Sequence, residues 1–475
     1  MGVALASFFL YPLASALEGD RYYLHWQPHH STEAVAALAL LTVGLGAALR
    51  LADRLTGIAA ATVAVLISAV PLASLGAGVA RQLPFRLSLI AAWQRPGLAA
   101  GVAAVAATIV LAGIALRPER IRRGLFATLL VLSPVSLIVL KAFAAAALRD
   151  APPYERRVEP AASTAPACGP VLALLFDELS FAYLYDGSDI RPEFPMLRRF
   201  AGGATQYTAV RSPGPETLVS LPGYLAARAV SGVQVAGDSV IEVRENGERV
   251  AFDAADASGL FGRAQQLGLR TEMAGYYFPY CDLLGARVDV CRAFSFYNHA
   301  TFERGWSPLN PILTTLILWP RQFPLGLLKN PAFAVQQRRL VEDTVAFAGR
   351  PLARGVFRLV HFSIPHLPFV FDAAGYDPPL DPLRTSPDTS YVAQLRYTDR
   401  LIGDLLDGLD RAGARDAATI LVLSDHGFRF GGRDTDPRHV PFLVKHAGQR
   451  EPETIHTPAQ AEHLLPQVLD RACGR

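Results

Sequence analysis

The sequence predicts a bundle of about five transmembrane helices followed by an α/β/α domain with a mostly parallel sheet. Only 18% of the 475 residues are charged and the mean hydropathy is +0.24, whereas an average soluble domain has about a quarter charged residues. The apolar excess lies in the first third of the chain. Beyond it, apolar runs of strand length, such as 171–176, 357–362 and 419–423, alternate with helical stretches, which is typical of a parallel sheet covered on both faces.

Five apolar runs predict the membrane spans. They are residues 1–17, 33–50, 56–80, 97–116 and 124–140. Crossing the hydrocarbon core takes ~20 largely apolar residues, a length that the last four runs approach or exceed. The first run is shorter and also fits a cleaved signal peptide, because Ala14-Ser15-Ala16 is similar to a cleavage site, but no basic residues precede it. We expect a first span there.

The short loops between these runs predict the orientation. Arg50 and Arg54 lie in one loop, and four arginines lie between residues 117 and 123 of another. In a five-span chain both loops fall on the same side, which the positive-inside rule assigns to the cytoplasm. The opposite loop also holds three arginines, so the bias is moderate. The chain after residue 149 is therefore expected on the periplasmic or extracellular side of an inner or plasma membrane.

Composition divides the chain into three parts. We expect a transmembrane domain over 1–149, a Pro- and Ala-rich linker over 150–169 and an α/β domain over 170–475. A disordered chain is excluded, because low hydrophobicity and high net charge are both missing. The net charge of +3 is too small to indicate a nucleic-acid partner, and four cysteines are too few for a disulfide scaffold. The sequence leaves the oligomeric state open.

Acidic residues follow two of the apolar strands. One strand ends in Asp177 and Glu178, and another ends in Asp425 and His426. In open parallel sheets, ligands bind beyond the carboxyl ends of the strands. Adjacent carboxylates are expensive to bury there unless a cation neutralises them. An aspartate with a histidine favours zinc or manganese as that cation, with magnesium or calcium as alternatives.

Together these motifs resemble the sulfatase/alkaline-phosphatase superfamily. The resemblance rests on the acidic strand end at Asp177, on the Ser-Asp-His-Gly motif that ends at Gly427, and on the helix that contains Tyr391 and Asp399. It covers nearly all of the chain beyond the linker. It implies that this part is a sulfatase-like catalytic domain with an alkaline-phosphatase-like fold and a divalent metal cation. Asp399, in the middle of its helix, is interpreted as structural.

The segment 216–222 resembles the Thr-x-x-Ser-x-Pro pattern of membrane-anchored phosphoethanolamine transferases, with Thr217 at the nucleophile position. A helix N-terminus is a ready site for phosphate or sulfate, and a metal bound to the hydroxyl would activate it. The alternative is that Thr217 is simply an N-cap. The resemblance implies that the residues around the cation are Asp177, Glu178, Thr217, Asp425 and His426.

The same segment departs from true sulfatases. Those enzymes have a cysteine or serine in a Cys/Ser-x-Pro-x-Arg motif, which is oxidised to formylglycine. The corresponding positions here are Thr217, Val219 and Leu221. Because a threonine cannot become formylglycine, we expect a phosphoester reaction through a phosphothreonine. Sulfuric ester hydrolysis without formylglycine is the runner-up.

Three histidines complete the expected site. The resemblance implies that His361, His366 and His439 bind the substrate and protonate its leaving group. The expected function is metal-dependent transfer or hydrolysis of a phosphoester in a membrane lipid headgroup or an envelope glycan. A non-catalytic envelope binding protein is the alternative from a different class. The acceptor, water or an alcohol, is left open.

Two further features concern cysteines and a second membrane contact. Outside the cytoplasm, the spacing of Cys281 and Cys291 favours a disulfide, whereas the pairing of Cys168 with Cys473 is left open. Residues 310–328 are strongly apolar but broken by prolines. They form either a core helix or a surface segment that touches the outer leaflet.

Overall fold

We describe a computed structural model of the chain, which forms two compact units. One comprises Met1–Ala151, Tyr297–Gln336 and Leu380–Leu383, and the other comprises Pro152–Phe296, Gln337–Pro379 and Arg384–Arg475. The structure describes residues 1–19, 23–82, 96–149, 154–158, 168–236, 239–302, 305–318, 331–376, 387–430 and 432–475. Most of the expected linker lies outside these residues.

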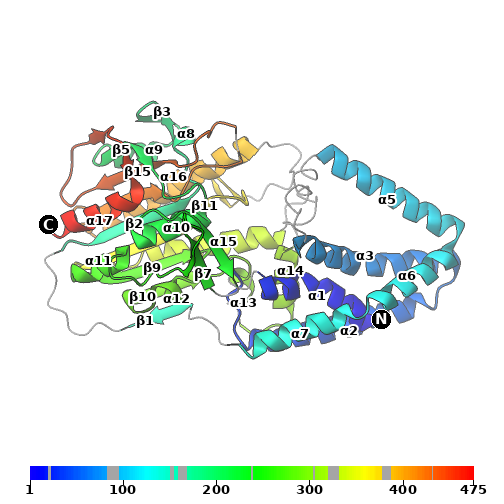
Figure 1. The fold of residues 1–475 in the computed structure, drawn as a ribbon. Helices are drawn as coiled ribbons and strands as arrows, with labels where there is room; N and C mark the ends of the chain where they lie inside the picture. Colours follow the sequence, from blue (N-terminus) through cyan, green and yellow to red (C-terminus); the bar gives the residue numbers. More distant parts are fainter. Residues whose placement is uncertain are drawn as a thin grey trace. The chain divides into compact units, whose positions relative to one another are not determined.

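The first unit is helical (Figure 1). Its central helix is α1, whose side chains from Ala4 to Leu17 are buried and which packs against α2, α3 and α7. The helices of this unit are α1 (Gly2–Gly19), α2 (His30–Ala52), α3 (Gly57–Gln82), α5 (Pro96–Leu116), α6 (Pro118–Leu132), α7 (Val135–Ala147), α13 (His299–Phe302) and α14 (Leu309–Leu318).

Three of these helical stretches are long and apolar enough to cross a membrane, against the five expected. They are His30–Ala52, Gly57–Gly76 and Pro118–Ala147, which joins α6 and α7. The other two expected spans correspond to α1 and α5. The apolar stretches found within these two helices are Gly2–Glu18 and Ala107–Leu116, and each is shorter than a full span. A five-span topology therefore stays a prediction.

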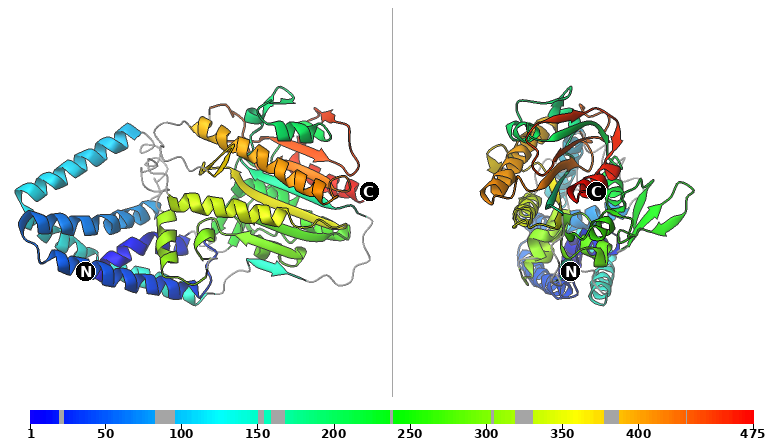
Figure 2. Two further views of the ribbon diagram at one scale, coloured as in Figure 1. Left: turned by 180° about the vertical axis from the view of Figure 1, so that it is seen from behind. Right: turned by 90° about the vertical axis from the view of Figure 1, so that its left-hand side faces the viewer.

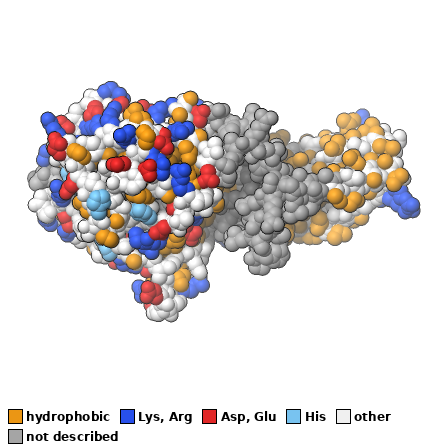
Figure 3. All heavy atoms as spheres, turned by 90° about the horizontal axis from the view of Figure 1, so that it is seen from above, with side chains coloured by type: hydrophobic (Ala, Val, Ile, Leu, Met, Phe, Trp, Pro, Cys, Tyr) orange, Lys and Arg blue, Asp and Glu red, His pale blue; other side chains and the backbone are white. Residues whose placement is uncertain are grey.

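The helical unit exposes large apolar side chains. Val43 and Val131 are 71% and 75% exposed, and Leu66 and Ile109 are each 66% exposed. Figure 3 shows hydrophobic side chains over most of the visible surface of these helices, whereas charged side chains are spread over the other unit. Soluble proteins rarely expose contiguous apolar patches of this kind, and lipid is the environment that suits them. These helices are consistent with a membrane protein.

Helix α14 belongs to the helical unit and packs against α1 and α2. Glu33 at the start of α2 binds the segment before and within α14, because its Oε1 accepts hydrogen bonds from Ser307 N at 3.0 Å and Asn310 Nδ2 at 3.2 Å. The apolar segment expected over 310–328 is thus a helix up to Leu318 that packs on apolar helices. Its remainder lies outside the described residues.

The second unit is built on a mixed sheet of ten strands, ordered β1-β10-β9-β11-β2-β14-β15-β5-β16 with β17 also paired to β5. The central strands β10, β9, β11, β2 and β14 are parallel, while β1 and β15 are antiparallel to their neighbours. The expected mostly parallel sheet is confirmed. The strands are β1 (Glu155–Arg157), β2 (Val171–Asp177), β5 (Thr205–Arg211), β9 (Arg270–Tyr276), β10 (Val290–Phe294), β11 (Val356–Pro365), β14 (Thr419–Ser424), β15 (His439–Lys445), β16 (Glu453–Ile455) and β17 (Ala459–Gln460).

Helices cover both faces of this sheet (Figures 1 and 2). On one side α10, α11 and α17 pack together, and α16 packs on β11 and α9. The central strands β2, β11 and β14 are buried along their whole length, as expected for near-continuous apolar runs. The helices are α8 (Phe181–Leu184), α9 (Pro195–Ala201), α10 (Thr217–Ala226), α11 (Leu260–Gln266), α12 (Tyr280–Leu284), α15 (Pro331–Ala348, with residues from Gln337 in this unit), α16 (Pro387–Arg411) and α17 (Ala461–Ala472).

Small sheets complete the unit. The three-stranded sheet of β6 (Val233–Ala236), β7 (Ser239–Val243) and β8 (Arg249–Ala251) projects from the main body in the right-hand view of Figure 2. Two-stranded sheets are formed by β3 (Tyr185–Asp186) with β4 (Asp189–Ile190), and by β12 (Phe371–Asp372) with β13 (Gly375–Tyr376).

Candidate active site

The register of two parallel strands brings the acidic strand ends together. Ser424 of β14 pairs with Phe176 of β2, so Asp425 and Asp177 come next on adjacent strands. Asp177, Asp425 and His426 each offer a ligand atom, and these atoms lie within 4.8 Å of one another. All three side chains are buried. The sequence places acids at strand ends, and the sheet places the strand ends side by side.

The histidine of this group is oriented by its own backbone. His426 Nδ1 lies 2.8 Å from Gly427 O, and because a carbonyl only accepts, Nδ1 is the donor. Nε2 therefore carries the lone pair, and it lies 3.5 Å from Asp177 Oδ1 and 3.6 Å from Asp425 Oδ2. Gly427 is required at its position, because a Cβ there would lie 2.2 Å from Asp434 Oδ2.

The ligand atoms fit a divalent cation. Asp425 Oδ1 accepts hydrogen bonds from the backbone N–H groups of Glu178 and His426, at 3.1 and 2.7 Å. Its Oδ2 is buried and has no hydrogen-bond partner among the described residues. A buried carboxylate oxygen of this kind is expensive without a partner. Carboxylate oxygens with an imidazole nitrogen form a donor set that suits zinc or manganese, the cations that the sequence favours.

Burial and like charge act on the two aspartates. Burial raises the pKa of Asp177 well above its ordinary value, and the charges of Asp425 and Glu178 raise it further. The pKa of Asp425 is also raised, first by burial. Burial lowers the pKa of His426 to about 3, so its imidazole is neutral at physiological pH. Positive charge at this point would favour both ionised aspartates, because opposite charge lowers a carboxyl pKa.

Thr217 lies on this group of ligands. Its Oγ1 is 3.2 Å from His426 Nε2 and 3.5 Å from Asp177 Oδ1, and its side chain is buried. Thr217 is the first residue of α10, and the N-cap residue is Glu216, with extended backbone and no side-chain cap bond. The N-cap interpretation of Thr217 is therefore wrong. The hydroxyl faces the acidic group instead of the free N–H groups of its own helix.

Two residues further along α10 tie this helix to the strand that carries Asp425. Ser220 Oγ donates to Asp425 O at 2.5 Å, and Tyr224 Oη donates to Ser424 O at 2.8 Å. Both side chains are buried. They fix the distance between the start of α10 and the end of β14. Neither residue was expected to have a role, although Ser220 is the serine of the Thr-x-x-Ser-x-Pro pattern; Tyr224 lies seven residues after Thr217 and outside that pattern.

Glu178 does not join the three-residue group. Its backbone has a φ of 63°, and its Oε1 accepts a hydrogen bond from Arg429 Nε at 3.1 Å. Burial raises the pKa of Glu178 to about 8, although Arg429 acts in the opposite direction. Arg429 also lies 3.4 Å from Glu216 Oε2. Sequence reasoning missed Arg429, whose signal was its position two residues after Gly427.

Of the three expected substrate histidines, His361 lies next to the acidic group on the sheet. His361 pairs with Leu175 of β2, which lies two residues before Asp177. The side chains of His361 and Asp177 therefore point to the same face of the sheet. His361 is fully buried, and burial lowers its pKa to about 4 although the charge of Asp425 opposes the shift. Its Nε2 is buried and has no hydrogen-bond partner within the described part of the chain.

The other two histidines differ in their surroundings. His366 Nε2 lies 4.0 Å from Glu178 Oε1, and its Nδ1 donates to Leu367 O at 2.6 Å. His439 Nε2 donates to Thr208 O at 2.8 Å, and its ring stacks on Phe181 with 3.9 Å between centroids. His366 is therefore beside the site through Glu178, whereas the described contacts of His439 are with β5 and α8.

Asp399 has the structural surroundings that its position suggests. Its carboxylate accepts hydrogen bonds from Met196 N at 3.1 Å and Leu197 N at 2.7 Å. These are free N–H groups in the first turn of α9. Asp399 thus caps one helix from the middle of another.

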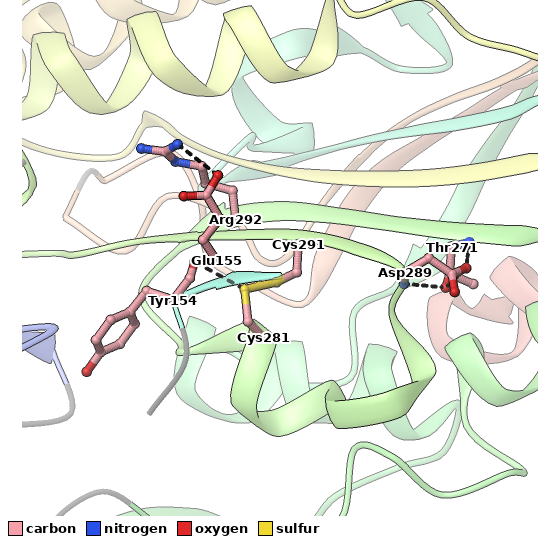
Figure 4. The surroundings of a disulfide bond; sticks show 7 residues. All are labelled: Tyr154, Glu155, Thr271, Cys281, Asp289, Cys291 and Arg292. Atoms are coloured by element: carbon pink, nitrogen blue, oxygen red, sulfur yellow. Dashed lines mark hydrogen bonds and ion pairs between the residues drawn. A yellow bond between two sulfur atoms is a disulfide. The ribbon is translucent and has the colours of Figure 1, made fainter. Parts of the chain in front are cut away.

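All four cysteines are in disulfides. Cys281 of α12 is bonded to Cys291 of β10, and Cys168 is bonded to Cys473 across a separation of 305 residues. Figure 4 shows the first bond, with Tyr154 and the Glu155–Arg292 ion pair beside it. The Cys281–Cys291 disulfide joins α12 to β10, which lies between β1 and β9 in the sheet.

Residues 159–474 match the family model described as Sulfatase. No curated protein matches the sequence significantly. Two solved structures to which the chain is similar are the phosphonate monoester hydrolase of Agrobacterium radiobacter (14% identity, 64% of this chain and 73% of that chain, TM-score 0.41) and PsFucS1 sulfatase from Pseudoalteromonas sp. (15% identity, 65% and 68%, TM-score 0.41).

Proposed function

This chain belongs to the sulfatase family, and from that premise we propose that it is a membrane-anchored, metal-dependent enzyme that hydrolyses or transfers phosphoesters through Thr217. The family match confirms the resemblance to the sulfatase/alkaline-phosphatase superfamily. The observation that carries the proposal is the position of the Thr217 hydroxyl, 3.2 Å from His426 Nε2 and 3.5 Å from Asp177 Oδ1. A threonine at this point can act as a nucleophile but cannot be converted to formylglycine.

Asp177, Asp425 and His426 would hold the cation, with Thr217 Oγ1 completing the set. A divalent cation at this point supplies positive charge that favours the ionised hydroxyl and the anionic phosphoryl oxygens. Glu178 was expected among the ligands, but its hydrogen bond to Arg429 supports a different role, which is to orient that guanidinium. Arg429 then presents charged N–H donors to a phosphoryl oxygen.

The reaction proceeds in two displacements. Thr217 Oγ1 gives its proton to a water molecule and forms a bond to phosphorus, while the bond from phosphorus to the leaving oxygen breaks. That oxygen takes a proton from a histidine, for which His361 is the favoured residue because its Nε2 is buried beside Asp177 and Asp425. Water or an alcohol then attacks the phosphothreonine and gives its proton to the same histidine, while the bond from phosphorus to Thr217 Oγ1 breaks and Oγ1 takes up a proton from water.

The substrate is a lipid headgroup or an envelope glycan at the outer face of the membrane. The three apolar helices long enough to span a bilayer support membrane attachment. The arginine-rich loop at 117–123 favours a cytoplasmic position for that loop, which puts the catalytic domain on the periplasmic or extracellular side. Both points are part of the proposal.

The test is turnover of phosphodiester and sulfate-ester substrates, measured side by side on the purified full chain. Thr217→Ala should reduce phosphodiester turnover by at least about a thousandfold, since removal of a covalent nucleophile costs this much or more. Thr217→Ser should keep part of the activity. The matched control is Thr398→Ala, which removes a buried hydroxyl that donates to Gln394 O within α16. It should turn over like the wild type.

Intact mass adds a second readout. After incubation with membrane lipids, the wild type should gain a phosphoryl-substituent mass that Thr217→Ala does not gain. Sulfate-ester turnover without phosphodiester turnover would refute the phosphoryl reaction and favour the runner-up. Full activity in Thr217→Ala would remove the nucleophile assignment. Absence of turnover and of any adduct in the wild type would favour a non-catalytic binding protein.

A further inference from the structure

We propose that Tyr280 is a positioning residue for His361. The Tyr280 hydroxyl holds the His361 imidazole so that its Nε2 faces the reacting phosphoryl group. The inference rests on the proposed function, since it concerns the histidine that protonates the leaving oxygen there. No sequence motif indicated a role for Tyr280. The role is inferred from the arrangement of α12, β9 and β11 in the folded chain.

The contact itself is short and shielded from water. Tyr280 Oη lies 2.9 Å from His361 Nδ1, and both side chains are fully buried. Tyr276 adds two contacts to the same ring: its carbonyl oxygen lies 3.3 Å from Nδ1, and its ring stacks on the imidazole with 4.9 Å between centroids. With Nδ1 engaged on one side, the opposite nitrogen, Nε2, is left for the site.

The direction of Nε2 follows from the sheet. His361 pairs with Leu175 across β11 and β2, and Leu423 of β14 pairs with the same Leu175. Asp177 and Asp425 lie two residues beyond Leu175 and Leu423, so their side chains share the face of His361. Tyr280 approaches His361 from the side of β9, which is the side of β11 away from β2. The imidazole thus lies between the phenol and the acidic group.

A phenol suits this position because it can both donate and accept. When His361 carries one proton on Nε2, Tyr280 donates to Nδ1; when both nitrogens are protonated, Tyr280 Oη and Tyr276 O accept from Nδ1–H. The negative charge of a bound phosphoryl group favours the doubly protonated ring. During the step, Nε2 gives its proton to the leaving oxygen as the bond from phosphorus to oxygen breaks. The remaining proton stays on Nδ1, bonded to Tyr280 and Tyr276. A phenylalanine would make neither bond.

The backbone is built to allow this approach. Gly275 of β9 lies beneath the pair, and a Cβ at that position would be 2.8 Å from His361 Cβ and 2.9 Å from Tyr280 Cε2. Any side chain there would push the two rings apart. Tyr280 is the first residue of α12, and the next residue, Cys281, is bonded to Cys291 of β10 (Figure 4). The disulfide therefore anchors the start of α12, and with it Tyr280, to β10.

The experiment compares Tyr280→Phe with Tyr397→Phe in the full chain. Tyr397→Phe is the control, because it also removes a phenol hydroxyl, from a ring of α16 that stacks on Phe371 with 4.3 Å between centroids. Each variant is assayed with an alkyl phosphodiester, whose leaving group needs a proton, and a nitrophenyl phosphodiester, whose leaving group does not.

With the alkyl substrate, Tyr280→Phe should lower kcat about 10- to 100-fold with little change in KM, as removal of such supporting hydrogen bonds does in other sites. With the nitrophenyl substrate the loss should be within about twofold, because proton donation no longer limits the rate. Tyr397→Phe should match the wild type with both. Adding Tyr280→Phe to His361→Gln should cost nothing further, since both act through one group.

Equal losses on both substrates, or an additional loss in the double variant, would overturn the proposal. A failure of the Tyr280 proposal can be distinguished from a failure of the proposed function. Nitrogen NMR of the histidine-labelled full chain, with His361 assigned by its absence in His361→Gln, reads the contact without turnover. Tyr280→Phe should shift the His361 Nδ1 resonance and Tyr397→Phe should not. An unshifted resonance in Tyr280→Phe would overturn the proposal even if the wild type has no phosphoester activity.

Discussion

At the scale of single residues, the site brings together two carboxylates that repel each other when the site holds no cation. Asp177 and Asp425 lie on adjacent strand ends, and each raises the energy of ionising the other. His426 is held neutral by burial with its Nε2 lone pair facing them. Such an arrangement is stable when positive charge is added. We infer that the aspartates and the histidine act as one unit that binds a divalent ion.

This leads to a prediction about metal content. Asp425→Asn keeps the shape of the side chain but removes its charge, so bound metal should fall to below about a tenth of the wild-type level after gel filtration in metal-free buffer. The measurement is elemental analysis of the purified full chain. His439→Gln is the control and should retain the metal, because the His439 ring bonds Thr208 O. Full metal occupancy in Asp425→Asn would refute the assigned ligands.

At the scale of elements, the end of β15 carries a buried histidine whose ring has no hydrogen-bond partner among the described residues. His446 follows Lys445 directly, and neither of its ring nitrogens has such a partner there. Burial is the main cause that lowers its pKa from 6.5 to about 4. Arg471 of α17 and Lys445 lower the pKa further, while Glu453 of β16 opposes them. The packing of β15 against its neighbours thus favours the uncharged imidazole.

The consequence is a dependence of stability on pH. Because the folded pKa lies below the unfolded pKa, the unfolded chain binds the proton more tightly between pH 6.5 and about 4. The free energy of unfolding is therefore highest above pH 6.5 and falls as the pH drops towards 4. The shift corresponds to at most ~3 kcal/mol.

His446→Leu tests this prediction, since leucine cannot take up the proton. Its thermal midpoint in detergent should decline less than that of the wild type between pH 6.5 and 4. His463→Leu is the comparison at another position of the same unit. Parallel pH curves for the wild type and His446→Leu would contradict the prediction.

At the scale of the whole molecule, the apolar helices and the sheet domain place different demands on the environment. Exposed side chains such as Val43 and Val131 need lipid, whereas the disulfides Cys168–Cys473 and Cys281–Cys291 need an oxidising compartment. Both demands are met when the helices span a membrane and the sheet domain lies outside the cytoplasm. This is the topology that the arginines at 117–123 also favour.

Reporter fusions test this topology. Alkaline phosphatase fused after Gly169 should be active, and green fluorescent protein at the same position should not fluoresce, because each reporter matures on one side of the membrane only. A fusion in the loop at 117–123 should give the opposite pattern. Fluorescence after Gly169 without phosphatase activity would show that the sheet domain is cytoplasmic.

The sequence by itself determined the class of the molecule and the chemistry at its strand ends. A long apolar region followed by alternating strands and helices is a local pattern, and so is an apolar run that ends in Asp177 or in Asp425. The motifs that indicated the superfamily are also local, and the family match confirms the superfamily. Where length alone decided, as for the number of spans, only three of the five expected helices reach a full span within the described residues.

Only the tertiary structure decided which residues meet. Thr217 lies 40 residues from Asp177 and 209 from His426 in sequence, and its distance to both depends on the pairing of β2 with β14 and on the bonds of Ser220 and Tyr224. The same holds for Glu178 with Arg429, 251 residues apart, and for Tyr280 with His361, 81 residues apart. A sequence pattern records what each strand end or helix start carries. The partner across the sheet is set by register and packing, which are properties of the folded chain.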